Sequence, residues 1–83
     1  MGVLKYPLAT EKAIGIVDKR NTITYIVDYR ASKTDISKEF QEKFGVKVAS
    51  VKTANMPNNV KKAFIQIASG SSANEIAMKL KLV

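Results

Sequence analysis

The side chains of this chain best suited to chemistry are its cations. It has 14 Lys and Arg and only 7 Asp and Glu, which gives a formal net charge of +7. Such an excess repels itself in a compact fold, and proteins that carry it usually bind a polyanion, most often nucleic acid and next an anionic membrane surface. Seven cations stand near the ends of predicted elements, where neighbouring elements converge: Lys12, Arg20, Lys33, Lys47, Lys52, Lys61 and Lys62. These seven are the candidate phosphate-binding residues, and a solvated surface charge is the alternative for any single one.

Three of these lysines flank one predicted turn, with Lys52 before it and Lys61 and Lys62 after it. On the two strands of a hairpin their ammonium groups are expected to lie close together, which is repulsive until phosphates neutralise them. Two polar side chains on the first strand, Thr53 and Asn55, are expected to add hydrogen bonds to sugar or phosphate. The hairpin is therefore the predicted centre of an RNA-binding surface.

The chain lacks the side chains that most enzymes use. It has no His, the commonest general acid or base, and no Cys, which excludes thiol nucleophiles, disulfides and Cys–His zinc sites. Its Ser and Thr have only Lys and carboxylates as potential bases, and neither GxGxxG nor GxxxxGK[ST] occurs. We therefore predict a binding protein without catalytic activity, metal or cofactor.

Aromatic residues are few, and most fall on apolar faces of predicted elements. Phe40 and Phe44 share a helical stripe, while Tyr25 and Tyr29 share a strand face, so all four are predicted core residues. The segment 61–67 (KKAFIQI) partly resembles the first RNP motif of RNA recognition motifs, with Phe64 as its central aromatic. Its other aromatic positions are not aromatic, which argues against stacking of bases on an open sheet and favours phosphate contact and shape readout.

The first half of the chain predicts an extended N-terminus, a helix, a strand and a second helix. Thr10 can cap a helix over residues 11–18, and the β-branched and aromatic run 22–29 predicts a strand after a turn at residues 20–21. Ser32 with Asp35 resembles a capping box for a helix whose apolar stripe is Ile36, Phe40 and Phe44, and Gly45 can end it.

The second half predicts a hairpin and a last helix. Residues 46–55 and 61–69 alternate as strands around a turn at 56–59, and the slipped alternation between Val48 and Val51 predicts a bulge. Ser72 and Glu75 have the spacing of a capping box, and the helix after them would bury Ala73, Ile76, Ala77 and Leu80.

The resulting order is β-α-β-α-β-β-α, which predicts an α+β fold, a small sandwich of helices on a mostly antiparallel four-stranded sheet. Residues 1–83 are predicted to form a single RNA-binding domain, since their length suits one modest core. No apolar run is long enough to span a bilayer, and residues 1–7 do not resemble a signal peptide, so we expect a cytoplasmic protein without membrane insertion.

The string Tyr6-Pro7-Leu8-Ala9-Thr10-Glu11-Lys12-Ala13 resembles the opening signature of the family of the twenty-third large-subunit ribosomal protein, in which Pro precedes Ser/Thr-Glu-Lys-Ala. Later segments resemble the same family in the same order: residues 21–27, 31–36, 44–48, 51–53 and 61–64. The short turn at 56–59 resembles the archaeal form, which lacks the long extension of bacterial members. Two departures are Lys52 in place of the usual Asn, and Asn58-Asn59 in place of Lys-Gly.

This resemblance implies a structural protein that binds large-subunit ribosomal RNA beside the polypeptide exit tunnel, among neighbouring ribosomal proteins of the cytoplasmic ribosome. It also implies a docking surface for nascent-chain factors such as the signal recognition particle. By motif position Glu11 would belong to that docking surface, and Lys12 and Lys33 would contact rRNA. For Glu11 the alternative is a simple first-turn helix anion.

Two other functions remain open at this stage. The chain could be a stand-alone protein that binds single-stranded RNA or DNA, which would require accessible aromatics. It could instead be a protein-interaction adaptor whose basic surface meets acidic partners. Outside the ribosome we expect a monomer.

Overall fold

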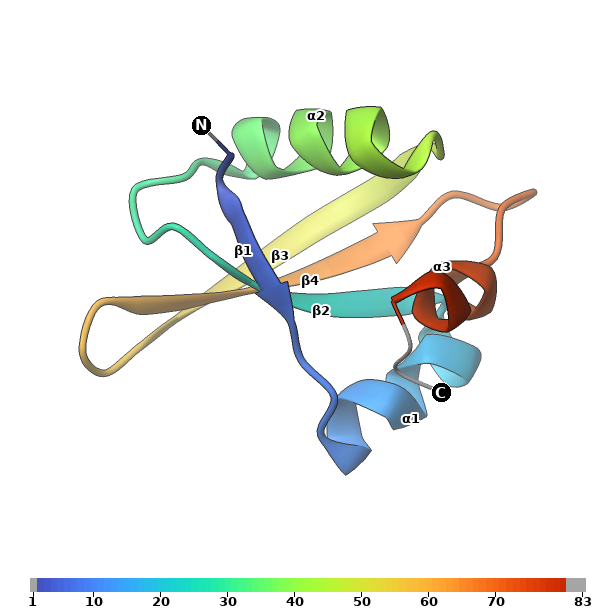
Figure 1. Ribbon diagram of the computed structural model, residues 1–83, viewed down its shortest axis with the longest axis horizontal. Helices are drawn as coiled ribbons and strands as arrows, with labels where there is room; N and C mark the ends of the chain where they lie inside the picture. The colour runs from blue at the N-terminus through green and yellow to red at the C-terminus, as the bar shows by residue number, and fades with distance from the viewer. Residues whose placement is uncertain (1, 81–83) are drawn as a thin grey trace.

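The computed structural model describes residues 2–80 and contains three helices and four strands in the predicted order (Figure 1). The elements are β1 (Leu4–Pro7), α1 (Glu11–Arg20), β2 (Thr22–Val27), α2 (Lys33–Phe44), β3 (Val48–Met56), β4 (Val60–Ile67) and α3 (Ala73–Lys79). Among the described residues no helix is long and apolar enough to cross a membrane.

The four strands form one antiparallel sheet in the order β1-β2-β4-β3, which confirms the predicted α+β fold. β3 and β4 are the two strands of the predicted hairpin, and β2 pairs with β4 from Thr22 opposite Gln66 to Val27 opposite Lys61. β1 is short and pairs only with the second half of β2, residues 25–27.

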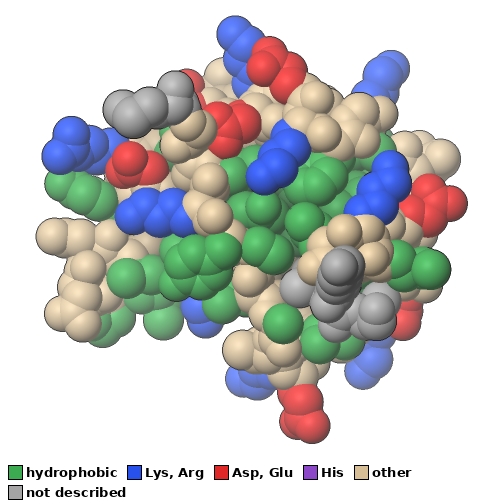
Figure 2. All heavy atoms as spheres, in the orientation of Figure 1, with side chains coloured by type: hydrophobic (Ala, Val, Ile, Leu, Met, Phe, Trp, Pro, Cys, Tyr) green, Lys and Arg blue, Asp and Glu red, His purple; other side chains and the backbone are tan. Residues whose placement is uncertain are grey.

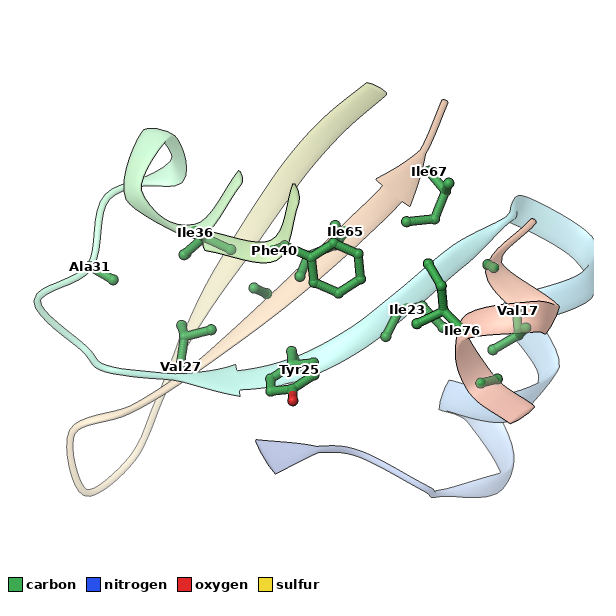
Figure 3. Close-up of a cluster of buried hydrophobic side chains, with 13 residues drawn as sticks. Val17, Ile23, Tyr25, Val27, Ala31, Ile36, Phe40, Ile65, Ile67 and Ile76 are labelled. Carbon is green, nitrogen blue, oxygen red and sulfur yellow. The ribbon is translucent and has the colours of Figure 1, made fainter. Parts of the chain in front are cut away.

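The core lies on one face of this sheet. Because strand side chains alternate between faces, β2 turns Ile23, Tyr25 and Val27 to the same side as the alternate residues of β4, namely Ala63, Ile65 and Ile67. α2 adds Ile36 and Phe40, and α3 adds Ile76, to this cluster (Figure 3). The rings of Phe40 and Tyr25 meet edge to face with centroids 6.3 Å apart, as aromatic pairs prefer.

Local signals at the first two helices are confirmed. The hydroxyl of Thr10 accepts the backbone N–H of Ala13 at the start of α1. Ser32 and Asp35 form a complete capping box at the start of α2, and Gly45 ends that helix in the left-handed conformation, φ 66°. These caps depend only on residues three or four apart, so the sequence contains all the information they need.

The predicted capping box of the last helix is wrong. The Ser72 side chain makes no capping hydrogen bond. The N–H of Ala73 is instead bound by the side-chain oxygen of Asn21, 52 residues away in sequence, at 2.7 Å. A tertiary contact therefore replaces the local one at this helix end.

The predicted strand over residues 22–29 ends two residues early, at Val27. Asp28 starts a turn, in which its carbonyl accepts the N–H of Ala31 and its carboxylate accepts the N–H of Arg30. Tyr29 consequently leaves the sheet and is 45% exposed, which corrects its assignment to the core.

Other boundaries move by one or two residues. α1 continues through Arg20 and ends on Asn21 in the left-handed conformation, so the predicted turn there is a helix C-cap. The bulge predicted in β3 is present between Val48 and Ser50. The hairpin turn is short and is closed by Asn58 and Asn59, both with positive φ, as expected for Asn.

The shortness of β1 decides where α1 lies. On the side away from β4, residues 22–24 of β2 have no neighbouring strand, and only one hydrogen bond reaches them there, from the N–H of Leu8 to the carbonyl of Thr24. α1 packs along this part of β2 and also contacts α3. It buries Val17 in the core, while Ile16 faces the other side of the sheet. We call that other side, which α2 and α3 do not cover, the open face.

Candidate nucleic-acid interface

The lysines of the hairpin divide between the two faces of the sheet. Lys52 pairs with Phe64, and Lys62 pairs with Ala54, on the open face. Lys61 pairs with Asn55 on the opposite face, since its neighbour Ala63 two residues on is buried in the core. The expected gathering of all three ammonium groups is therefore wrong, because adjacent strand residues point to opposite sides.

Lys61 has a partner of its own. Its ammonium group donates to the carbonyl oxygen of Ala31 at 2.7 Å, and its side chain is half-buried. The contact joins β4 to the loop that precedes α2. Lys61 thus satisfies a backbone carbonyl on the helix-covered face.

The open face is hollowed where α1 stands beside the sheet. Two adjoining hollows of about 540 and 470 Å³ share Ile16, Arg20 and Phe64, and together we call them the groove. One side is formed by α1, and the floor is formed by β2, β4 and β3. The further lining residues are Leu8, Thr10, Lys12, Ala13, Lys19, Thr22, Thr24, Ser50, Lys52, Lys62 and Gln66.

Four of the predicted phosphate-binding residues meet at this groove. Lys12 and Arg20 come from α1, Lys52 from β3 and Lys62 from β4. Lys19 also lines it and was missed by the sequence analysis. A signal existed, because Lys19 follows Ile16 by three residues and Lys12 by seven, spacings that share a helix face.

The floor of the groove combines an apolar centre with polar groups. Phe64 and Ile16 are half-buried and supply the apolar part. The hydroxyl of Thr22 donates to the carbonyl of Arg20 at 2.9 Å, and the hydroxyl of Ser50 donates to Oε1 of Gln66 at 3.0 Å. The groove therefore presents an apolar floor beneath a cationic rim.

One polar group of the floor is unsatisfied. Thr24 is 3% exposed, and its Oγ1 is the one buried side-chain N or O atom among residues 2–80 without a hydrogen-bond partner. Buried hydroxyls normally have a partner, because losing hydrogen bonds to water costs about 1–3 kcal/mol. This exception lines the groove and does not belong to the core cluster.

The remaining predicted site residues lie outside the groove. Lys33 lines a separate hollow between α2 and the edge strand β3. Lys47 is exposed in the loop before β3, where its carbonyl accepts the N–H of Ala68. The structure does not bring these two lysines to the cations of the groove.

Thr53 and Asn55 lie on the face opposite to the groove. Thr53 pairs with Ala63, and Asn55 pairs with Lys61. The side chains predicted to bind sugar or phosphate are thus separated from Lys52 and Lys62 by the sheet itself.

Glu11 is exposed in the first turn of α1, beside Lys12. Its carboxylate suits the positive end of the helix dipole. Across residues 2–80 no group of three or more His, Cys, Asp or Glu is placed to hold a metal ion.

Comparison with known proteins identifies the family of this chain. Residues 2–80 match the family described as Ribosomal protein L23. This chain belongs to the ribosomal protein L23 family. It is 40% identical over 81 residues to the large ribosomal subunit protein uL23 of Trypanosoma brucei brucei, which covers 98% of the chain and 49% of that relative. The chain thus spans about half the length of the trypanosome relative.

An archaeal relative is matched over most of its own length. The large ribosomal subunit protein uL23 of Methanothermobacter thermautotrophicus is 37% identical over 78 residues, covering 94% of the chain and 91% of the relative. Membership of the L23 family confirms the resemblance given by the Thr10-Glu11-Lys12-Ala13 motif. It also makes the chain a non-enzymatic ribosomal protein of the cytoplasm, as the sequence predicted.

Proposed function

We propose that this protein is a structural part of the large ribosomal subunit and binds its ribosomal RNA through the groove. The observation that supports this most directly is the convergence of five cations from three separate elements, namely Lys12, Lys19, Arg20, Lys52 and Lys62. A cluster of this kind is repulsive in isolation and becomes favourable when a phosphate backbone releases its counterions.

The geometry favours contact with the RNA backbone along the rim. Lys52 lies opposite Phe64 on the ladder, and Lys62 lies two residues before Phe64, so the two lysines are diagonal neighbours on the open face. Arg20 and Lys12 stand across from them on α1. A strand of RNA along the groove would thus have cations on both sides.

The L23 family also implies a position at the polypeptide exit tunnel and partners beyond RNA. We propose that Glu11 belongs to the docking surface for the signal recognition particle or other nascent-chain factors. Its exposure in the first turn of α1 supports this role, and its neighbour Lys12 lines the groove. The docking surface would then border the RNA surface on one helix, with Lys33 and Lys47 available for additional contacts to rRNA or neighbouring ribosomal proteins.

The proposal is tested by the salt dependence of binding to deproteinised large-subunit rRNA. Lys52→Ala/Lys62→Ala removes two cations of the groove. We expect weaker binding and a plot of log K against log salt that is flatter by roughly one to two units, since each phosphate contact contributes a little under one. Filter binding between 50 and 400 mM KCl measures this slope.

Lys38→Ala/Lys79→Ala is the matched control, because it removes the same charge from exposed positions on α2 and α3. It should leave the slope close to that of the wild type. Lys61→Ala should change the slope less than Lys62→Ala, because Lys61 points to the other face and binds Ala31. If the groove pair and the control pair flatten the slope equally, the groove is not the binding site.

A further inference from the structure

We propose that the groove holds a single unpaired RNA base, stacked against Phe64, and so selects RNA that displays such a base. This inference rests on the proposed rRNA binding and names the feature of the RNA that the groove recognises. Phosphate binding alone would not distinguish an unpaired base from a continuous duplex.

Phe64 occupies the right place for a stacking platform. It is the only aromatic side chain that lines the groove, it lines both hollows, and it is half-buried, so part of its ring remains accessible. It lies in β4, an interior strand, between Thr24 of β2 and Lys52 of β3. Backbone pairing on both sides therefore fixes the platform.

The groove has the size and lining of a small-molecule site. Its two hollows, about 540 and 470 Å³, fall within the roughly 300–1,000 Å³ of typical ligand pockets. Ile16 of α1 supplies a second apolar surface beside the ring. A base entering here would contact apolar atoms of both the sheet and α1.

The cations are placed for the phosphates that would accompany that base. Lys52 lies directly across from Phe64, and directly opposite residues of a sheet have Cβ atoms about 5 Å apart. Arg20 lines both hollows with Phe64 and carries a planar guanidinium, which can bind phosphate or stack on a base. An anionic and partly aromatic ligand therefore fits this surface better than a neutral one.

Thr24 supplies an independent indication of a ligand. Its unsatisfied hydroxyl lies across the ladder from Phe64. The hydroxyl is covered in the free protein, so a base edge would reach it only after a neighbouring side chain moves. A base offers donors and acceptors that would satisfy it.

The sequence of β4 indicates how many RNA bases the groove can stack. Of the residues in segment 61–67 that resemble the first RNP motif, only Phe64 is aromatic. Its open-face neighbours two residues away are Lys62 and Gln66. The sheet thus offers one stacking position flanked by polar side chains, not a row of positions for consecutive bases.

The test compares two RNA hairpins with the full chain. One carries a single bulged 2-aminopurine in its stem, and the other has the same stem fully paired. We expect the wild type to bind the bulged RNA roughly 5- to 150-fold more tightly, the range that corresponds to stacking of one base on an aromatic ring, and to change the fluorescence of the 2-aminopurine. Phe64→Leu keeps apolar volume without an aromatic face, and should remove this preference while preserving the affinity and salt slope for paired RNA.

Each other outcome counts against the inference. Equal binding of both hairpins by the wild type would overturn base recognition and leave phosphate binding by the groove intact. A Phe64→Leu variant that weakens both RNAs in parallel with a lower melting temperature would assign Phe64 a packing role only. A poly-glutamate peptide that displaces the bulged RNA as well as unlabelled bulged RNA does would assign the groove to an acidic protein. No binding of either RNA at low salt would overturn this inference together with the proposed function.

A second pair of variants tests the hydroxyl. Thr24→Val keeps the shape of the side chain, and should reduce the preference for bulged RNA several-fold without lowering the melting temperature. Thr53→Val is the matched control, because Thr53 lies on the opposite face of the sheet, across from Ala63; it should leave the preference for bulged RNA unchanged. A preference that Thr24→Val leaves unchanged would exclude Thr24 from the site.

Discussion

The side chain of Asn21 joins segments that are far apart in the sequence. Its amide nitrogen donates to the carbonyls of Ile67 and Ser71, both at 3.1 Å, and its amide oxygen accepts the N–H of Ala73. Its own backbone ends α1 in the left-handed conformation, φ 51°. One residue therefore joins the end of α1 and the start of β2 to the end of β4 and the start of α3.

We predict that Asn21→Gly lowers the free energy of unfolding by about 2–3 kcal/mol, because three hydrogen bonds of roughly 1 kcal/mol each are lost. Glycine accepts the left-handed backbone, so the loss would report the side chain and not strain. Urea denaturation followed by circular dichroism measures the change.

Asn59→Gly is the control for this substitution. Asn59 has nearly the same φ, 59°, in the exposed hairpin turn. Its replacement should change the free energy of unfolding by no more than about 0.5 kcal/mol. Equal effects at positions 21 and 59 would show that the side-chain contacts of Asn21 contribute little.

At the scale of the element, α2 is stabilised by residues of its own segment, whereas β1 is stabilised by a residue from elsewhere in the chain. α2 has both caps and its apolar stripe within its own sequence, with Ile36 and Phe40 fully buried. β1 is held from outside, because the carboxylate of Glu39 on α2 accepts the N–H groups of Val3 and Leu4 at 2.9 and 2.7 Å. α2 thus follows from local sequence, whereas β1 depends on a helix that comes later in the chain.

The cap of α2 gives a prediction about pH. Hydrogen bonds from the backbone and side chain of Ser32 hold the pKa of Asp35 below its usual 3.8. Between the lowered pKa and 3.8, the unfolded chain therefore binds more protons than the folded chain. The stability that ionised Asp35 contributes is complete above pH 3.8 and is lost as the pH falls through the lowered pKa. Asp35→Asn should be less stable than the wild type at pH 6, and the difference should vanish towards pH 2.

Thermal unfolding of the two proteins between pH 6 and pH 2 tests this prediction. The comparison isolates Asp35, since all other carboxylates are shared and Asn can still accept the N–H of Ser32. A difference in stability that stays constant over the whole range would contradict it.

At the scale of the whole molecule, positive charge is not confined to the groove. Figure 2 shows Lys and Arg distributed around an apolar area between α2 and α3, with Asp and Glu among them. What distinguishes the groove is the combination of cations with an accessible aromatic ring and an apolar floor. The net charge of +7 therefore favours association with polyanions in general, and under the proposed function the groove would supply the local specificity.

Self-repulsion should make the isolated protein more stable when salt screens its charges. Between 20 and 500 mM KCl we expect the free energy of unfolding to rise by a few tenths to about 1 kcal/mol. Lys52→Ala/Lys62→Ala should be more stable than the wild type in 20 mM KCl and should gain less from added salt. Urea midpoints that do not move with salt in either protein would show that this repulsion is negligible.

The sequence by itself determined the order of elements, the limits and caps of α2, the bulge and short turn of the hairpin, and the family. These features arise from residues close together in the chain, through hydrogen bonds at spacings of three and four and through side-chain periodicity. Even the placement of Lys61 and Lys62 on opposite faces was available from the twofold alternation of a strand, although the prediction grouped them.

The tertiary structure alone decided which surface the cations share and how two pairs of distant segments are joined by side-chain hydrogen bonds. Lys12 and Arg20 meet Lys52 and Lys62 because a short β1 leaves room for α1 beside β2. Asn21 replaces the expected cap of α3, and Glu39 anchors β1, over separations of 52 and 35–36 residues. The physical reason is that each such contact depends on how the chain folds back on itself, and that path is fixed by the whole core and not by any local pattern.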